Sequence, residues 1–208
     1  MQNLRERVTS AARLSNDGLA NIHELAYDLP NFVWLIQTFP DLILVAGREE
    51  ILQELNSLLQ QHSRTNTQLL SYNTTFNFGE FYLSVLLFRT TCFTENPVIP
   101  ALFMVHEHKL SSTHGRFVEI LADKVPALNN SNCVLVTDGE ASFDVLQERF
   151  VKLNKVFCWN HTLTAAKHWL RGHNASTSDI MVYVDHIRTL LHSSTLQSYK
   201  TSYTEFSK

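Results

Sequence analysis

An aspartate at the end of an apolar run has the setting that best suits chemistry. Asp138 directly follows the apolar residues 133–137 and precedes Gly139. The carboxyl end of a buried strand is where α/β sheets hold ligands, and a neighbouring glycine leaves room for a metal ion or a phosphate. An acid at this position also suits the cap of a helix beginning at Glu140. We therefore expect Asp138 to be either a metal ligand or a helix cap.

A thiol and an imidazole form the second candidate. Cys158 and His161 have a C-x-x-H spacing, which suits two ligands of one Zn²⁺ ion. A structural zinc site needs four ligands, and the sequence holds no second C-x-x-C or H-x-x-H pair. The alternatives are a buried thiol beside a helix-start histidine, and a nucleophile with its base, for which no orienting partner is visible. Folding would have to bring the further zinc ligands to this pair, and the candidates are His168, His173, His186 and His192.

A polar residue in a predicted strand is the third candidate. Residues 68–89 predict two strands joined by a polar turn at 77–80, where Gly79 supplies the positive φ that such a turn needs. Thr74 and Thr75 close the first strand. Asn73 lies in that strand, where a sheet that does chemistry often carries a carboxylate. The interleaved aromatic residues of this hairpin favour core positions over base stacking.

Composition indicates a globular protein. Of 208 residues, 44% are hydrophobic and 18% charged, and no apolar run approaches the roughly 20 residues of a membrane helix. Residues 1–15 carry charges and no apolar core, so no secretory signal is expected. The three cysteines predict free thiols in a reducing compartment. A net charge of −3 argues against a strongly basic nucleic-acid binder and leaves a local basic groove open.

Hydrophobic periodicity predicts the elements that position these residues. Residues 31–39 are ambiguous, the tail 193–208 is polar, and His106, Glu107 and His108 are expected on the surface or in a loop. Residues 133–137 are apolar at successive positions, which predicts a strand buried on both faces. Helices are predicted at 4–29, 49–61, 111–125, 141–151, 159–171 and 179–192, and further strands at 41–46, 98–106 and 156–158.

From residue 68 onward the order of elements is β-β-β-α-β-α-β-α. Three antiparallel strands followed by alternating helices and strands predict an α/β protein with a mixed sheet and a ribonuclease H-like fold. The first and fourth strands lie side by side in that layout, so Asn73 and Asp138 are expected to meet at one rim. We predict three regions: a mostly helical extension at 1–66, the core at 67–171, and C-terminal helices at 172–208.

Four sequence motifs in this order resemble one transposase family. They are SYNTTFNFGEFYLS, PALFMVHEHK, CVLVTDGEASF and VFCWNH. Together they resemble the MULE (Mutator-like element) transposase domain, in the version found in transposon-derived animal proteins. The resemblance covers about residues 68–171, and the helices that follow would correspond to the start of that family's helical insertion.

The resemblance implies a DNA cut-and-join enzyme with two aspartates and a glutamate that hold two Mg²⁺ ions. Asp138 matches the second acid, and Cys158 with His161 matches the family's C-x-x-H pair, the residues of the expected Zn²⁺ site. The first acid falls on Asn73, and the third is expected beyond the chain's end, because Glu205 lacks its context. Asparagine supplies no charge at position 73. A charge pair ~4 Å apart is worth on the order of 4 kcal/mol at an effective dielectric of ~20, so losing it would slow the reaction roughly 10³-fold.

We therefore expect a transposase-derived, catalytically impaired domain that binds DNA or a protein partner. One alternative is an active Mg²⁺-dependent DDE transposase fragment completed by residues outside this chain or by a homo-oligomer. A second is an interaction scaffold with no nucleic-acid role. The resemblance implies a nuclear location, although no localisation signal is visible, and a cytoplasmic one otherwise. No membrane partner is expected.

Overall fold

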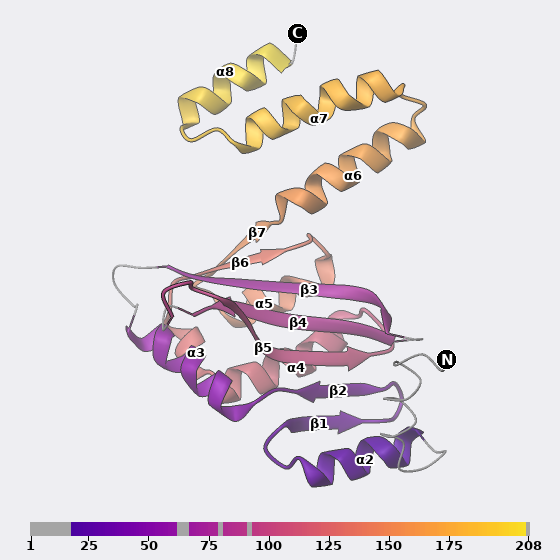
Figure 1. Cartoon of the computed structure of the whole chain (residues 1–208), viewed down its shortest axis with the longest axis vertical. Coiled ribbons are helices and arrows are strands. Elements are labelled where there is room, and N and C mark those ends of the chain that lie inside the picture. Colours follow the sequence, from indigo (N-terminus) through magenta and orange to yellow (C-terminus); the bar gives the residue numbers. More distant parts are fainter. Residues whose placement is uncertain (1–17, 62–66, 79–80, 91–92, 207–208) are drawn as a thin grey trace, which may run out of the picture. The chain divides into compact units, whose positions relative to one another are not determined.

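The computed structural model describes residues 18–61, 67–78, 81–90 and 93–206. The chain divides into two compact units (Figure 1). The first unit holds the residues up to 135 together with 141–154, and the second holds 136–140 together with the residues from 155 onward.

The fold is α/β, with a seven-stranded mixed open sheet. The strand order is β1-β2-β5-β4-β3-β6-β7, so β3 lies between β4 and β6. The first and fourth strands predicted from residue 68 onward, which are β3 and β6, are therefore neighbours in the sheet. The strands are β1 (Val33–Gln37), β2 (Ile43–Ala46), β3 (Gln68–Phe78), β4 (Phe81–Arg89), β5 (Val98–His106), β6 (Cys133–Thr137) and β7 (Leu153–Phe157). The helices are α2 (Gly18–Asp28), α3 (Glu49–Gln61), α4 (Ser111–Lys124), α5 (Asp144–Arg149), α6 (Trp159–Gly172), α7 (Thr177–Leu191) and α8 (Leu196–Phe206), with 3₁₀ turns η1 (Pro126–Asn129) and η2 (Ala141–Phe143).

The hairpin of β3 and β4 is antiparallel, as predicted. β3 does not close at Thr75 but runs on to Phe78, which pairs with Phe81 across a register shift. The predicted turn residues Gly79 and Glu80 lie outside the described residues. The hairpin therefore supplies two long neighbouring strands to the middle of the sheet.

The core lies on one face of the sheet. Side chains alternate between the faces of a strand, so buried residues recur at every second position. Leu70 and Tyr72 of β3 face the core together with Leu86 and Phe88 of β4, and all four are fully or almost fully buried. In Figure 1, α4 and α5 lie behind these strands. Core residues that α3 and α4 contribute include Leu52, Leu55, Phe117 and Leu121.

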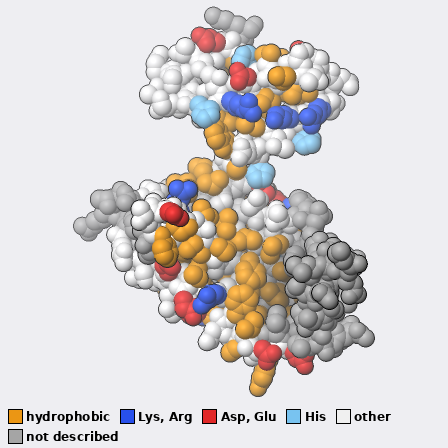
Figure 2. All heavy atoms as spheres, viewed as in Figure 1, with side chains coloured by type: hydrophobic (Ala, Val, Ile, Leu, Met, Phe, Trp, Pro, Cys, Tyr) orange, Lys and Arg blue, Asp and Glu red, His pale blue; other side chains and the backbone are white. Residues whose placement is uncertain are grey.

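The opposite face is apolar and only half-buried over β4 and β5, whereas β3 carries Ser71, Asn73 and Thr75 there. Val85 of β4 pairs with Phe103 of β5, and both side chains are of intermediate exposure. Figure 2, seen from the same side as Figure 1, shows hydrophobic side chains gathered over these strands. The sheet thus has a dry core face and a partly wetted apolar face.

Pro100 does not interrupt β5, because the sheet adapts around it. The register of β4 with β5 shifts between Leu86 and Leu87, and Leu87 then pairs with Pro100. Pairing of β5 with β2 begins only at Phe103. A proline without an N–H is tolerated at such irregular positions.

Several elements differ from the sequence-based expectation. The ambiguous segment at 31–39 contains strand β1, and the polar tail contains helix α8. The helix expected at 141–151 is a 3₁₀ turn followed by the short α5. β6 alternates between buried and half-buried side chains instead of being buried on both faces, since one face of the sheet is less covered.

The N-terminal region adds to the sheet and core. Residues 1–17 of the predicted first helix lie outside the described residues, and α2 occupies the remainder. β1 and β2 extend the sheet beyond β5, and α3 contributes to the core. The domain boundaries predicted from the sequence stay predictions.

The second unit contains three consecutive helices, α6, α7 and α8. α7 begins at a capping box, in which Ser176 Oγ accepts the Asp179 N–H at 3.2 Å and the Asp179 carboxylate accepts the Ser176 N–H at 3.2 Å. Several large apolar side chains of α7 and α8 are exposed, among them Met181, Val182 and Tyr203. Within the described residues, no helix of either unit is long and apolar enough to cross a bilayer.

Candidate functional site

Asn73 lies in the middle of β3, on the half-buried face of the sheet, with Ser71 and Thr75 on the same side of the strand. Its cross-strand neighbour is Val85, beyond which lies Phe103. The Oδ1 atom of Asn73 is buried and accepts no hydrogen bond within the described part of the chain. An unsatisfied buried carbonyl costs roughly 1–3 kcal/mol in lost hydration, a cost that an apolar side chain at this position would not have.

Asp138 stabilises a local turn after β6. Its Oδ1 accepts the Glu140 N–H at 3.0 Å, while Thr137 Oγ1 accepts the Gly139 N–H at 3.3 Å. Gly139 has φ +92°, and a Cβ there would lie 3.2 Å from the ring of Phe157. The positive φ favours glycine at this position, whereas the exposed Phe157 ring could shift to admit a Cβ. Asp138 thus fills part of the expected role of a helix cap, because its carboxylate holds the turn that leads into η2.

The residues suggested for Mg²⁺ do not form a complete site in the described structure. Mg²⁺ prefers octahedral oxygen ligands and is usually held by carboxylates. Asn73 offers one neutral oxygen, and one oxygen of Asp138 already accepts a backbone N–H. Asn73 belongs to the first unit and Asp138 to the second, and the expected meeting of their side chains stays a prediction.

Cys158 and His161 lie at the start of α6. Cys158 is the N-cap residue, and its N–H donates to the Thr137 carbonyl at 2.6 Å, which ties the helix start to the end of β6. The Cys158 side chain is half-buried and His161 is exposed. Among the described residues, no third metal-ligating side chain joins this pair. Zinc binding at Cys158 and His161 therefore stays a prediction, and the described donor set does not complete it.

Three of the histidines considered as further ligands contact aromatic rings instead. His173 stacks on Trp169 at 4.0 Å between ring centroids and donates its Nδ1–H to the Trp169 carbonyl at 2.8 Å. His192 meets Trp159 edge-on at 4.7 Å, and His186 meets Phe206 at 5.1 Å. In the described part of the second unit, these three histidines do not join Cys158 and His161 in a group of metal ligands.

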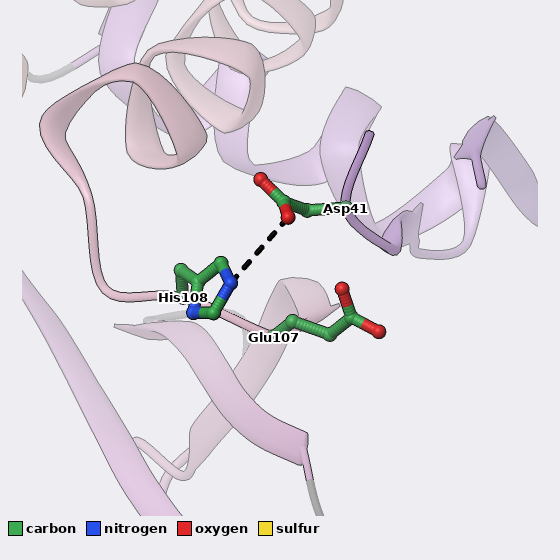
Figure 3. A group of neighbouring side chains, drawn as sticks. All are labelled: Asp41, Glu107 and His108. Carbon is green, nitrogen blue, oxygen red and sulfur yellow. Dashed lines mark ion pairs between the residues drawn. The ribbon is translucent and has the colours of Figure 1, made fainter. Parts of the chain in front are cut away.

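A different group of three potential ligands lies beside β2 and β5. Asp41, Glu107 and His108 each offer a ligand atom, and these atoms lie within 4.8 Å of one another. Figure 3 shows Asp41 and His108 pointing toward each other, with 3.4 Å between Oδ1 and Nε2. Glu107 Oε2 accepts the Leu42 N–H at 3.0 Å, so its carboxylate helps hold the strand ends together. These contacts account for the group without a metal ion.

His106 lies in a buried polar network that sequence reasoning missed. We expected a surface or loop residue, but His106 ends β5 with no exposed surface. Its Nδ1–H donates to the His108 carbonyl at 2.9 Å, so in the neutral ring Nε2 accepts the Ser84 hydroxyl at 2.8 Å. Thr74 then donates to Ser84 Oγ at 2.6 Å.

The Ser84–His106 pair has the contacts of a nucleophile with its base, but neither side chain has exposed surface. A substrate cannot reach a serine that is fully enclosed in the core. The pair therefore joins the neighbouring strands β4 and β5 and has no catalytic role. Burial distinguishes it from a hydrolase site of the same local geometry.

His114 is the second buried histidine of the core. Its Nδ1 is hydrogen-bonded to the Tyr72 hydroxyl at 2.8 Å, and its ring meets His106 edge-on at 5.2 Å between centroids. Burial, with smaller contributions from His106 and Lys109, lowers the pKa of His114 to about 3. His114 Nε2 is buried without a hydrogen-bond partner in the described residues. The ring is thus neutral at physiological pH and links β3 to α4.

A signal for His106 was present in the sequence. Leu102, Met104 and His106 are spaced by two, so a strand that buries the first two also buries the third. For His114 the corresponding signal is helical spacing, since Phe117, Val118 and Leu121 share its buried face. In both cases the polar character of histidine suggests the surface, whereas its position in the strand or helix repeat places it on the buried face.

The described cysteines have free thiols, as predicted, and Cys92 lies outside the described residues. Burial raises the pKa of the Cys133 thiol to about 11. Cys133 is therefore a core residue and not a nucleophile. Comparison of the chain with models of known protein families and with curated proteins gives no match.

Proposed function

We propose that the chain is a transposase-derived, ribonuclease H-like domain of the MULE type that acts by binding, not by cutting DNA. Two structural features support the fold assignment. The hairpin β3–β4 is followed by antiparallel β5, and β6 lies next to β3. The four sequence motifs fall on the hairpin, on β5, on β6 with its turn, and on the start of α6.

The observation that carries the loss of catalysis is Asn73. The position that matches the first metal-binding acid holds an amide whose buried Oδ1 has no hydrogen-bond donor within the described residues. Two-metal cleavage depends on carboxylates that neutralise both ions. An amide supplies no charge, so metal affinity and transition-state stabilisation are both reduced. DNA or a protein is then a partner to be bound and not a substrate.

We expect no metal-dependent cleavage when the full chain is incubated with labelled duplex DNA and Mg²⁺ or Mn²⁺. Gel analysis of the labelled strands checks this result, with Asp138→Asn as the matched control. Equal background in both proteins supports the proposal. Cleavage by the unaltered chain that Asp138→Asn abolishes would establish the alternative, an active DDE nuclease.

A further inference from the structure

The exposed face of α6 has an unusual composition for this acidic chain. α6 contains Lys167 and Arg171 and no acidic residue, although the whole chain has 20 acids and 17 lysines and arginines. On an α-helix, residues three and four positions apart share a face. One face of α6 therefore carries a set of polar and cationic side chains, all exposed except the half-buried Lys167: Asn160, His161, Thr164, Lys167, His168 and Arg171.

The neighbouring helix α7 adds a third cation to this face. Arg188 and Lys167 line the same shallow pocket of about 290 Å³, together with Met181 and one acid, Asp185. Figure 2 shows Lys and Arg side chains in a row on one face of the helical unit. Within the described residues, neither Lys167, Arg171 nor Arg188 has a carboxylate within ion-pair distance. The positive charge of the row is therefore only partly compensated, by Asp185.

The side-chain types on this face match one kind of ligand. Lysine, arginine, asparagine and threonine are the side chains with which proteins contact nucleic-acid phosphates. The 14 residues of α6 extend about 21 Å, and a duplex carries one phosphate per ~1.7 Å of axis. Several phosphates can thus lie along the helix at once. A solvated surface of ordinary composition would instead intersperse acids among these cations.

We propose that the α6 face, with Arg188 of α7, holds the phosphate backbone of double-stranded DNA without reading its sequence. The inference deepens the proposed function, on which its choice of DNA rests, by assigning the contact surface to the helical unit. Lys167, Arg171 and Arg188 bind phosphates, while the Asn160 side chain lies on the same face as a neutral hydrogen-bond donor. The Thr164 hydroxyl donates to the Asn160 carbonyl at 2.8 Å and is not counted as a phosphate contact. Asp185 opposes binding, because it places a negative charge beside two of the cations.

The test is fluorescence anisotropy of the full chain with a labelled DNA duplex of arbitrary sequence, across roughly 50–200 mM salt. Three phosphate contacts predict a slope of about −2.7 for log K against log salt, since each contributes about −0.9. Lys167→Gln, Arg171→Gln and Arg188→Gln should each flatten the slope by about 0.9, and the triple variant should bring it close to zero. Asp185→Asn should tighten binding without flattening the slope.

The matched control is the triple variant Arg48→Gln, Arg149→Gln, Lys152→Gln, which removes the same charge from exposed positions of the first unit. An unchanged slope in this control supports the assignment. If the control flattens the slope and the α6–α7 triple variant does not, the surface assignment is wrong and the proposed function stands. If the chain binds heparin as tightly as the duplex, and the same variants lose heparin binding, the choice of nucleic acid as the ligand is wrong. Absence of duplex binding by the unaltered chain overturns the inference, whereas the cleavage assay judges the proposed function separately.

Discussion

Acidification from pH 7 to pH 4 should lower the free energy of unfolding of the wild-type chain by about 3 kcal/mol more than that of His114→Leu. His114 is fully buried, and its pKa is lowered from 6.5 to about 3, first by burial. Between these pH values the unfolded chain takes up a proton that the folded chain refuses. Stability from this residue is therefore present above pH 6.5 and is lost as the pH falls toward 3.

Urea unfolding at a series of pH values measures this difference directly. The quantity compared is the pH dependence of each protein, so a lower absolute stability of the leucine variant does not affect the result. His114→Gln provides a second neutral side chain at the position. His23→Leu, which removes an exposed histidine from α2, is the control and should keep the wild-type dependence. Equal slopes for wild type and both His114 variants would mean that His114 accepts a proton in the folded core.

Asn73→Asp should destabilise the fold by about 2 kcal/mol at pH 8 in the absence of divalent metal. The variant places a carboxylate where the amide oxygen is buried without a donor in the described residues, opposite the apolar Val85. Burial raises the pKa of such a carboxylate, so the folded variant binds a proton more readily than the unfolded one. The deficit should therefore shrink as the pH falls toward 5.

Asn73→Val is the matched control for this prediction. It removes the orphaned oxygen and places an apolar side chain opposite Val85, so its stability should equal or exceed that of the wild type. Adding Mg²⁺ to Asn73→Asp should restore little of the loss, because the described residues do not complete a magnesium site. Full restoration of stability by Mg²⁺ would show that the other ligands of a working site are in place.

The central strands were predictable from sequence because their signals are local. β2, β5 and β6 are short apolar runs with clear ends, and the hairpin β3–β4 has its turn glycine and β-branched flanks. β1 and α8 were not assigned. β1 is a five-residue strand of intermediate burial at the sheet edge, and α8 has no buried residue. Elements with so little apolar burial leave weak periodicity in the sequence.

The candidate site was less predictable than the fold. The sequence correctly predicted Asp138 at the end of a strand. The hydrogen bond from the Glu140 N–H to its carboxylate, however, depends on a turn with Gly139 at positive φ. The network of Ser84, His106 and His114 depends on contacts between three elements, which no local pattern shows. Side-chain chemistry alone therefore misjudged His106, whereas strand phase would have placed it in the core.

The central claim is that the position of the first acid no longer contributes to metal binding. The most direct measurement is the number of Mn²⁺ ions bound per chain, determined by electron paramagnetic resonance with and without duplex DNA. We expect wild type and Asn73→Val to bind the same number of ions with the same affinity. If wild type binds two ions and Asn73→Val binds fewer, position 73 still contributes a metal ligand and the central claim is wrong.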